Sequence, residues 1–322
     1  MFKWWVLLTL YLTQGLPHGF FSQALPTLLR QQGMSLEAIG LMSLVSLPWV
    51  LKFLWAPLLD HYQPLKRLTK GRIDGHIRKT WIISANAIAA ITLIFIAATP
   101  LEFWINQAAV GLAAALFVLT IFVVTQDIAT DALAVENIST QQRGLGNSLQ
   151  VAGYRFGMII GGGLLLAIFA QLGWSGTLWA LASLMILGLV PLWYWQPAMV
   201  KVDKEPIFNH WLGFLRLPGA KAWLLLLLTY KVGDAFGTVM IRPQLVDLGV
   251  TLSEFAELLG LWGTVAGLAG ALLGGLLVKV LSRMQALMLC ILLEGVAIGF
   301  YALITSLDWS LIYALVIAEH IT

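Results

Sequence analysis

Long apolar runs separated by short polar connections limit what this chain can fold into more than any other feature. Several runs reach the roughly 20 residues that a helix needs to cross the hydrocarbon core of a bilayer. Of the 322 residues, 59% are hydrophobic and 11% are charged, whereas a soluble domain carries about 25% charged residues. The sequence therefore predicts a polytopic membrane protein. Its spans must be helices, because an open sheet leaves backbone hydrogen bonds unsatisfied in lipid.

The runs predict nine complete spans and a tenth that is incomplete at the end of the sequence. These predicted spans are residues 4–29, 36–59, 80–99, 103–134, 144–170, 174–195, 222–245, 254–280, 283–305 and 309 onward. The longest polar connection, residues 196–221, separates a six-helix bundle of residues 1–195 from a bundle of about four helices at residues 222–322. A weak internal repeat relates Gly33-Met34-Ser35-Leu36-Glu37 to Gly249-Val250-Thr251-Leu252-Ser253. Together these features predict an all-α major facilitator fold of two parallel six-helix bundles, truncated in the tenth span.

Basic residues gather on one side of the predicted membrane. That side holds Lys3, Lys66, Arg67, Lys70, Arg72, Arg78, Lys79, Arg143, Lys201, Lys204, Arg216, Lys221, Lys279 and Arg283. Only Arg30 and Arg242 fall on the other side. Because cytoplasmic connections carry an excess of Lys and Arg, the N-terminus and residues 196–221 are predicted to be cytoplasmic. The basic residues form no single patch, so the net charge of +3 does not indicate nucleic-acid binding.

The sequence contains no motif for a cofactor or for catalysis. It has no GxxxxGK[ST] phosphate loop, no HExxH pair and a single cysteine, Cys290, which argues against an ATP-driven pump and a metalloprotease. We therefore expect no cofactor, no metal and no enzyme activity. The alternative of a membrane enzyme or non-transporting receptor requires functional groups on one membrane face, whereas the charges within spans are spread along the chain. A monomer is expected.

Charged residues inside two neighbouring spans are the main functional signal, because such residues are rare and usually face a polar interior. Asp127 and Asp131 are four residues apart and share one helix face. Arg155 lies about 16 Å into the following span. Its guanidinium cannot deprotonate, so it needs a partner, either Asp127 or a ligand. Lys52 either snorkels toward the cytoplasmic interface or pairs with a carboxylate such as Asp127.

Polar residues in other spans complete the predicted site. In the first span, Gln14 and His18 flank Pro17. An interrupted helix can open a polar site in the membrane; alternatively, the helix is only kinked and its polar groups bond to neighbours. Lys231 and Asp234 are three residues apart and can neutralise each other. The predicted substrate-binding residues are Gln14, His18, Lys52, Arg155 and Lys231. The predicted proton-coupling residues are Asp127, Asp131, Asp234 and Glu294.

Glycines at four-residue spacing mark the fifth predicted span. Gly153, Gly157 and Gly161 form a ridge of small residues. Such a ridge is typical of close helix packing, and it can also allow two bundles to rock against each other.

Three stretches carry a resemblance to a known family: LPWVLKFLWAPLLD, TQDIATDA and RGLGNSLQVAGYRFGM. With their surroundings, residues 15–62 and 125–163, they resemble AmpG-like permeases of the major facilitator superfamily, most closely the RhtX/FptX-type siderophore importers. The resemblance implies a twelve-helix transporter of the bacterial inner membrane. The implied solute is an iron–siderophore complex, with a muropeptide as the alternative, and a proton gradient is the expected driving force. Of the superfamily's usual loop signature, only Asp60 and the basic pair Arg78-Lys79 are present.

Overall fold

The protein is entirely helical wherever regular structure is described, which confirms the predicted class of a polytopic α-helical membrane protein. The computed structural model describes residues 2–31, 34, 35, 39, 42–62, 76–197, 213, 215–229, 258, 262–301 and 309–321. The chain divides into two compact units, Met1–Lys204 and Glu205–Thr322. The division falls inside the connection predicted at residues 196–221. The predicted six helices in the first bundle and about four in the second remain a prediction.

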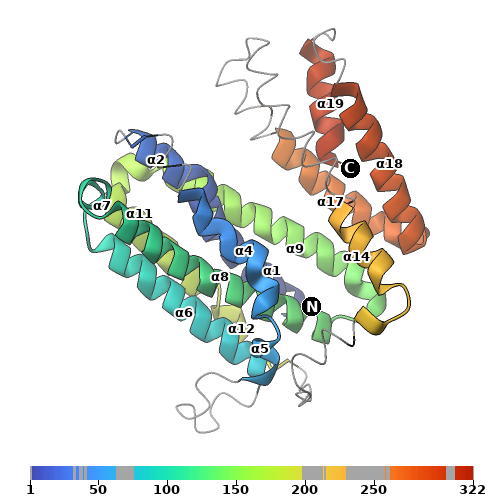
Figure 1. The fold of residues 1–322 in the computed structure, drawn as a ribbon, viewed down its shortest axis with the longest axis horizontal. Coiled ribbons are helices and arrows are strands. Elements are labelled where there is room, and N and C mark those ends of the chain that lie inside the picture. Colours follow the sequence, from blue (N-terminus) through green and yellow to red (C-terminus); the bar gives the residue numbers. More distant parts are fainter. Residues whose placement is uncertain are drawn as a thin grey trace. The chain divides into compact units, whose positions relative to one another are not determined.

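The N-terminal unit is a bundle of long helices extended by short ones (Figure 1). Its α-helices are α1 Phe2–Gly19, α2 Leu25–Gln31, α4 Leu47–Leu51, α5 Leu58–His61, α6 Ile77–Ala97, α7 Leu101–Asn106, α8 Ala109–Asn137, α9 Arg143–Met158, α10 Leu165–Ala167, α11 Phe169–Leu187 and α12 Val190–Tyr194. Helix α6 packs against both α8 and α11, and α1 packs along α9. Leu16, Leu93, Leu116 and Leu181, from four of these helices, meet in the core.

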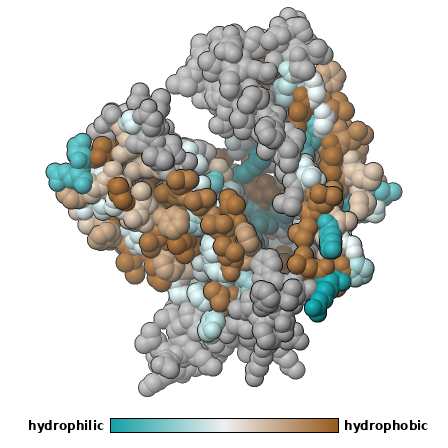
Figure 2. Space-filling model, viewed as in Figure 1, coloured by the Kyte–Doolittle hydropathy of each residue, from teal (hydrophilic) through white to brown (hydrophobic). Residues whose placement is uncertain are grey.

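Six helices in the described part of the chain are long and apolar enough to cross a membrane. They are Ile77–Ala97, Ala109–Asn137, Thr140–Ala167, Phe169–Tyr194, Gly263–Val280 and Arg283–Phe300. Their outward faces are apolar: on α6, Ile91 and Phe95 are 64% and 61% exposed. Apolar residues also dominate the described surface in the space-filling view (Figure 2). A surface of this kind is stable in lipid rather than in water.

The first helix occupies the centre of the N-terminal unit, where most of its residues, including Thr13 and Gln14, are buried. The chain is helical without interruption from Phe2 to Gln31, passing through Pro17 and a π-helical segment at Phe20–Ala24. That segment packs against a second π-helical segment, Ile159–Leu164, which continues α9. Since its neighbours shield α1 from lipid, this helix can carry polar side chains that an outer helix could not.

The glycine ridge allows α1 and α9 to approach until their backbones touch. A Cβ atom on Gly157 would lie 2.2 Å from the carbonyl oxygen of Leu12, and one on Gly161 would lie 1.9 Å from that of Leu16. Glycines on α1 match them, because a Cβ atom on Gly15 would lie 2.0 Å from the carbonyl oxygen of Tyr154. The predicted close packing is confirmed, and the rocking motion stays a prediction.

The second and fourth predicted spans are not single helices. In the span predicted at residues 36–59, the described part from residue 42 consists of α4, α5 and two 3-10 segments, Ser43–Ser46 and Lys52–Leu54. Pro48 and Pro57 account for the break, because proline donates no backbone hydrogen bond and clashes with the preceding turn. The span predicted at residues 103–134 is divided into α7 and α8 at Gln107 and Ala108.

A glycine separates the fifth and sixth spans. Helix α11 includes a kink at Gly173, whose φ of 65° and ψ of −174° are not helical. Glycine adopts positive φ without the steric penalty of a Cβ atom. The kink agrees with the predicted start of the sixth span at residue 174.

The described part of the second unit also consists of helices. These are α14 Ala220–Thr229, α17 Gly263–Val280, α18 Arg283–Phe300 and α19 Trp309–Ile321. A capping box begins α18: the Ser282 hydroxyl accepts from the Gln285 backbone N–H, and the Gln285 side chain accepts from the Ser282 N–H. Most of the span predicted at residues 222–245 lies outside the described residues.

Candidate functional site

An ion pair joins the second and fourth spans inside the N-terminal unit. Lys52 Nζ donates to Asp127 Oδ2 over 2.9 Å. Asp127 is only 8% exposed, so its charge needs a partner. Lys52 lies in a 3-10 segment that follows the break after α4. The predicted pairing of these two residues is therefore confirmed.

A second carboxylate lies one helical turn further along α8. Asp131 Oδ1 accepts a hydrogen bond from the Tyr11 hydroxyl at 3.2 Å and another from Gln150 Nε2 at 3.0 Å. Tyr11 belongs to α1 and Gln150 to α9. The carboxylate therefore joins three helices. Both donors are uncharged, in contrast to the ammonium group that holds Asp127.

An aromatic group surrounds His18 on the same central helix. The His18 ring lies edge-on to Trp49 with 5.0 Å between ring centroids, and 5.5 Å from the ring of Tyr154. Tyr154 precedes Arg155 on α9, where Arg155 is half-buried. His18 therefore lies between the second span and the helix that carries Arg155.

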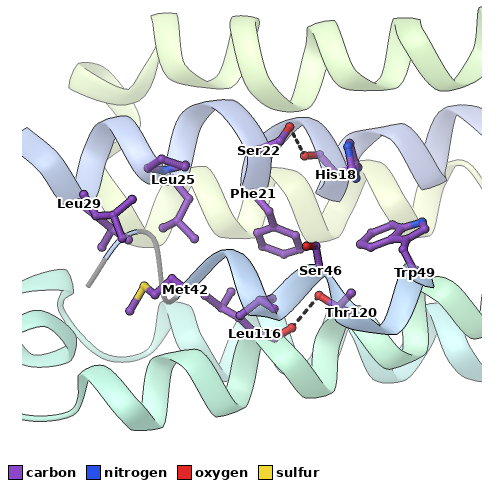
Figure 3. A pocket seen from close by; sticks show the side chains of 13 residues that line it. His18, Phe21, Ser22, Leu25, Leu29, Met42, Ser46, Trp49, Leu116 and Thr120 are labelled. Atoms are coloured by element: carbon purple, nitrogen blue, oxygen red, sulfur yellow. Dashed lines mark hydrogen bonds between the residues drawn. The ribbon is translucent and has the colours of Figure 1, made fainter. Parts of the chain in front are cut away.

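A cavity of about 470 Å³ extends from His18 between the first, second and fourth spans (Figure 3). His18 and Trp49 lie at one end of it, and Leu29 and Met42 lie at the other. The hydroxyls of Ser22 and Thr120 on its wall donate to backbone carbonyls of their own helices. The imidazole is thus the main polar feature of a largely apolar pocket.

Gln14 is a buried amide with an unused donor. It is 1% exposed, and its Nε2 finds no hydrogen-bond partner among the described residues. The neighbouring amide of Gln126 is satisfied, since its Nε2 donates to the hydroxyls of Thr13 at 3.4 Å and Thr130 at 3.2 Å. Burial of an unpaired donor is unfavourable, which fits a group that bonds to a bound solute.

The remaining predicted site residues belong to the second unit. Lys231 and Asp234 lie outside the described residues. Glu294 is half-buried in α18. The structure therefore brings together Lys52, Asp127 and Asp131, with Gln14, His18 and Arg155 on the helices that pack beside them.

Sequence reasoning missed four residues of this site: Tyr11, Trp49, Gln150 and Tyr154. The spacing of polar residues along α1 and α9 could have indicated three of them. Tyr11 is three residues before Gln14 and seven before His18, and Gln150 is four before Tyr154. Residues at these spacings share a helix face, so each set forms a polar stripe on an otherwise apolar span.

A cluster of charges lies at the end of the unit where α6 begins. The Arg78 guanidinium forms ion pairs with Asp60 and with Glu136, the latter at 2.9 Å. Lys79 donates to the carbonyl oxygens of Trp193 and Trp195, both at 3.1 Å. The Asp60 and Arg78 of the loop signature are therefore in direct contact, and Glu136 completes the cluster.

Comparison with known proteins gives a consistent set of relatives. The family model described as acetyl-coenzyme A transporter 1 matches residues 3–172. An anhydromuropeptide permease of Escherichia coli K12 is 32% identical over 310 residues, which cover 94% of this chain and 61% of the permease. An uncharacterized protein of Haemophilus influenzae is 32% identical over 302 residues, covering 88% of this chain and 67% of that protein.

A Rickettsia bellii protein that carries an AmpG transporter name is 27% identical over 285 residues, covering 84% of this chain and 67% of that protein. The chain thus spans about three fifths of the length of the Escherichia coli permease. The likeness to AmpG permeases inferred from the motifs is confirmed. None of these names mentions a siderophore.

Proposed function

Since this chain belongs to the family described as acetyl-coenzyme A transporter 1 and is similar to AmpG permeases along most of its length, we propose that it is a secondary transporter of an anhydromuropeptide. The observation that carries the proposal is the set of three ionisable groups formed by the half-buried Lys52 and Asp131 and the buried Asp127. It lies within a helical bundle whose outer faces are apolar. Ionisable groups placed this way line solute and ion pathways.

The proposed solute differs from the first expectation of the sequence motifs. Those motifs favoured an iron–siderophore complex, whereas the relatives favour a muropeptide, the second choice. A peptide-bearing solute has carboxylates and amides. Arg155 supplies a cation for the carboxylates. Gln14 Nε2, which has no partner among the described residues, supplies a hydrogen bond for the amides. Lys52 can bind the solute only in a state in which it has left Asp127. Lys231 remains a proposed solute contact from the second half of the chain.

The proposed driving force is an inward proton gradient. Moving one charge across the membrane yields about 2.3 kcal/mol per 100 mV. Asp127, Asp131, Asp234 and Glu294 are the candidate proton carriers. Two carboxylates one turn apart repel each other, and a proton on either relieves that repulsion.

We further propose that the chain forms two bundles around a central cavity. Its N-terminus is cytoplasmic, and it is inserted as a monomer in a bacterial inner membrane.

Uptake by vesicles that contain the purified chain tests this function. Labelled anhydromuropeptide should accumulate when the outside is made acidic, and a protonophore should abolish the accumulation. Unlabelled muropeptide should compete, whereas acetyl-coenzyme A and a ferric siderophore should not. Competition by acetyl-coenzyme A or by the ferric siderophore would show that the chain transports a different class of solute. Uptake that is insensitive to the protonophore would rule out proton coupling.

A further inference from the structure

The two carboxylates of α8 differ in their surroundings, and we propose that they have different roles. Asp131 is the carboxylate that binds and releases the transported proton, and Asp127 is the ionised counter-ion of Lys52. This assignment rests on the proposed proton-driven transport and names the site within it. It adds Tyr11 and Gln150 as the residues that position the proton-binding carboxylate.

The contacts of Asp127 oppose protonation. Its Oδ2 accepts directly from the Lys52 ammonium at 2.9 Å, and hydrogen bonds between two ions are about twice as strong as those between neutral groups. A proton on Asp127 would remove the negative charge that holds Lys52 in the bundle. Asp127 therefore acts as a fixed counter-ion while this pair is intact.

The contacts of Asp131 permit protonation. Tyr11 and Gln150 both donate to Oδ1, and no hydrogen bond from the described residues reaches Oδ2. A protonated carboxyl keeps acceptor capacity on its other oxygen. A proton on Oδ2 would therefore leave both hydrogen bonds in place, and the side chain can change charge without releasing α1 or α9.

Each helix around Asp131 contributes a defined group. Helix α1 presents the Tyr11 hydroxyl, the second span presents the Lys52 ammonium, α8 itself presents Asp127, and α9 presents the uncharged Gln150 amide. Lys52 is the cation of this set, and its hydrogen bond goes to Asp127. The Lys52 ammonium has three donors, so its approach to Asp131 while it still contacts Asp127 would expel the proton from Asp131 and couple proton release to a shift of the broken second span.

Infrared difference spectroscopy tests the assignment without any solute. The purified chain in lipid vesicles should show a carbonyl-stretching band of a protonated carboxyl that disappears as the pH is raised. Asp131→Asn should abolish this band, whereas the double variant Asp127→Asn with Lys52→Met, which removes the carboxylate and its cation together, should retain it. Glu102→Gln, which changes an exposed carboxylate of α7, should leave it unchanged. Loss of the band in the double variant with retention in Asp131→Asn, or no such band in the unmodified chain, would overturn the assignment.

Transport assays separate this inference from the proposed function. Asp131→Asn should lose proton-driven accumulation but keep solute exchange across the membrane, because exchange requires no net proton movement. Asp127→Asn should impair both proton-driven accumulation and solute exchange, because it leaves the Lys52 charge unpaired. Adding Lys52→Met removes that charge and should partly restore exchange. If the unmodified chain accumulates solute in a protonophore-sensitive manner and Asp131→Asn does the same, the assignment is wrong while the transport function stands.

Discussion

Arg78 is a single residue whose contacts connect three helices at one end of the bundle. It lies in the first turn of α6, where a cation opposes the helix dipole. Its placement is explained by Asp60 and Glu136, with which it pairs, and by the carbonyl oxygen of Leu59, to which it donates. The side chains of Arg78 and Glu136 are 12% and 14% exposed. Removing the guanidinium would leave a largely buried carboxylate without its cation.

Arg78→Ala should therefore lower stability by about 3 kcal/mol, the scale expected for breaking a buried ion pair. Thermal unfolding of the purified chain in detergent measures the effect. Arg143→Ala, which removes an exposed arginine at the start of α9, should change the unfolding midpoint little. Adding Glu136→Gln to Arg78→Ala should recover part of the loss. Equal midpoints for Arg78→Ala and Arg143→Ala would show that the cluster does not stabilise the bundle.

At the scale of elements, the backbone contact between α1 and α9 determines where the polar stripe of α1 lies. A Cβ atom on Gly157 would collide with the Leu12 carbonyl at 2.2 Å, and backbone cannot move aside as a side chain can. Overpacking of this kind costs about 1–3 kcal/mol, against about 0.5–1 kcal/mol by which alanine favours a helix over glycine. Gly157→Ala should therefore destabilise the protein and separate Gln150 from Asp131.

Gly163→Ala is the matched control for that substitution. It lies six residues further along the same span, and a Cβ atom there would meet nothing within 4 Å. This variant should unfold at the same temperature as the unmodified chain or at a higher one. If both variants were equally stable, the close approach of the two helices would not contribute to the fold.

At the scale of the whole molecule, the distribution of basic residues predicts the orientation in the membrane. Reporter fusions at residues 70 and 210 should both behave as cytoplasmic, because the basic connections of the chain lie on that side. A fusion at residue 100, between the third and fourth predicted spans, serves as the opposite control and should behave as periplasmic. A periplasmic signal at residue 70 or 210 would contradict the proposed topology.

The sequence by itself determined the class of the fold and the candidate charges. Long apolar runs specify membrane helices because backbone groups in lipid must bond within their own segment. Asp127, Asp131 and Arg155 were identifiable because charges are rare at that depth. The glycine ridge predicted close packing, since only small residues allow two helix backbones to touch. These features depend on composition and spacing along one helix, which a sequence contains directly.

Only the tertiary structure decided which groups meet. Lys52 had two possible environments, and the fold assigned it to Asp127 by bringing the broken second span against α8. Tyr11 and Gln150 gained their roles only because backbone contact between α1 and α9 places both beside Asp131. A hydrogen bond between residues 120 positions apart depends on how helices pack, and packing is a property of side chains from several helices together. The periodicity of a single span does not contain information about this packing.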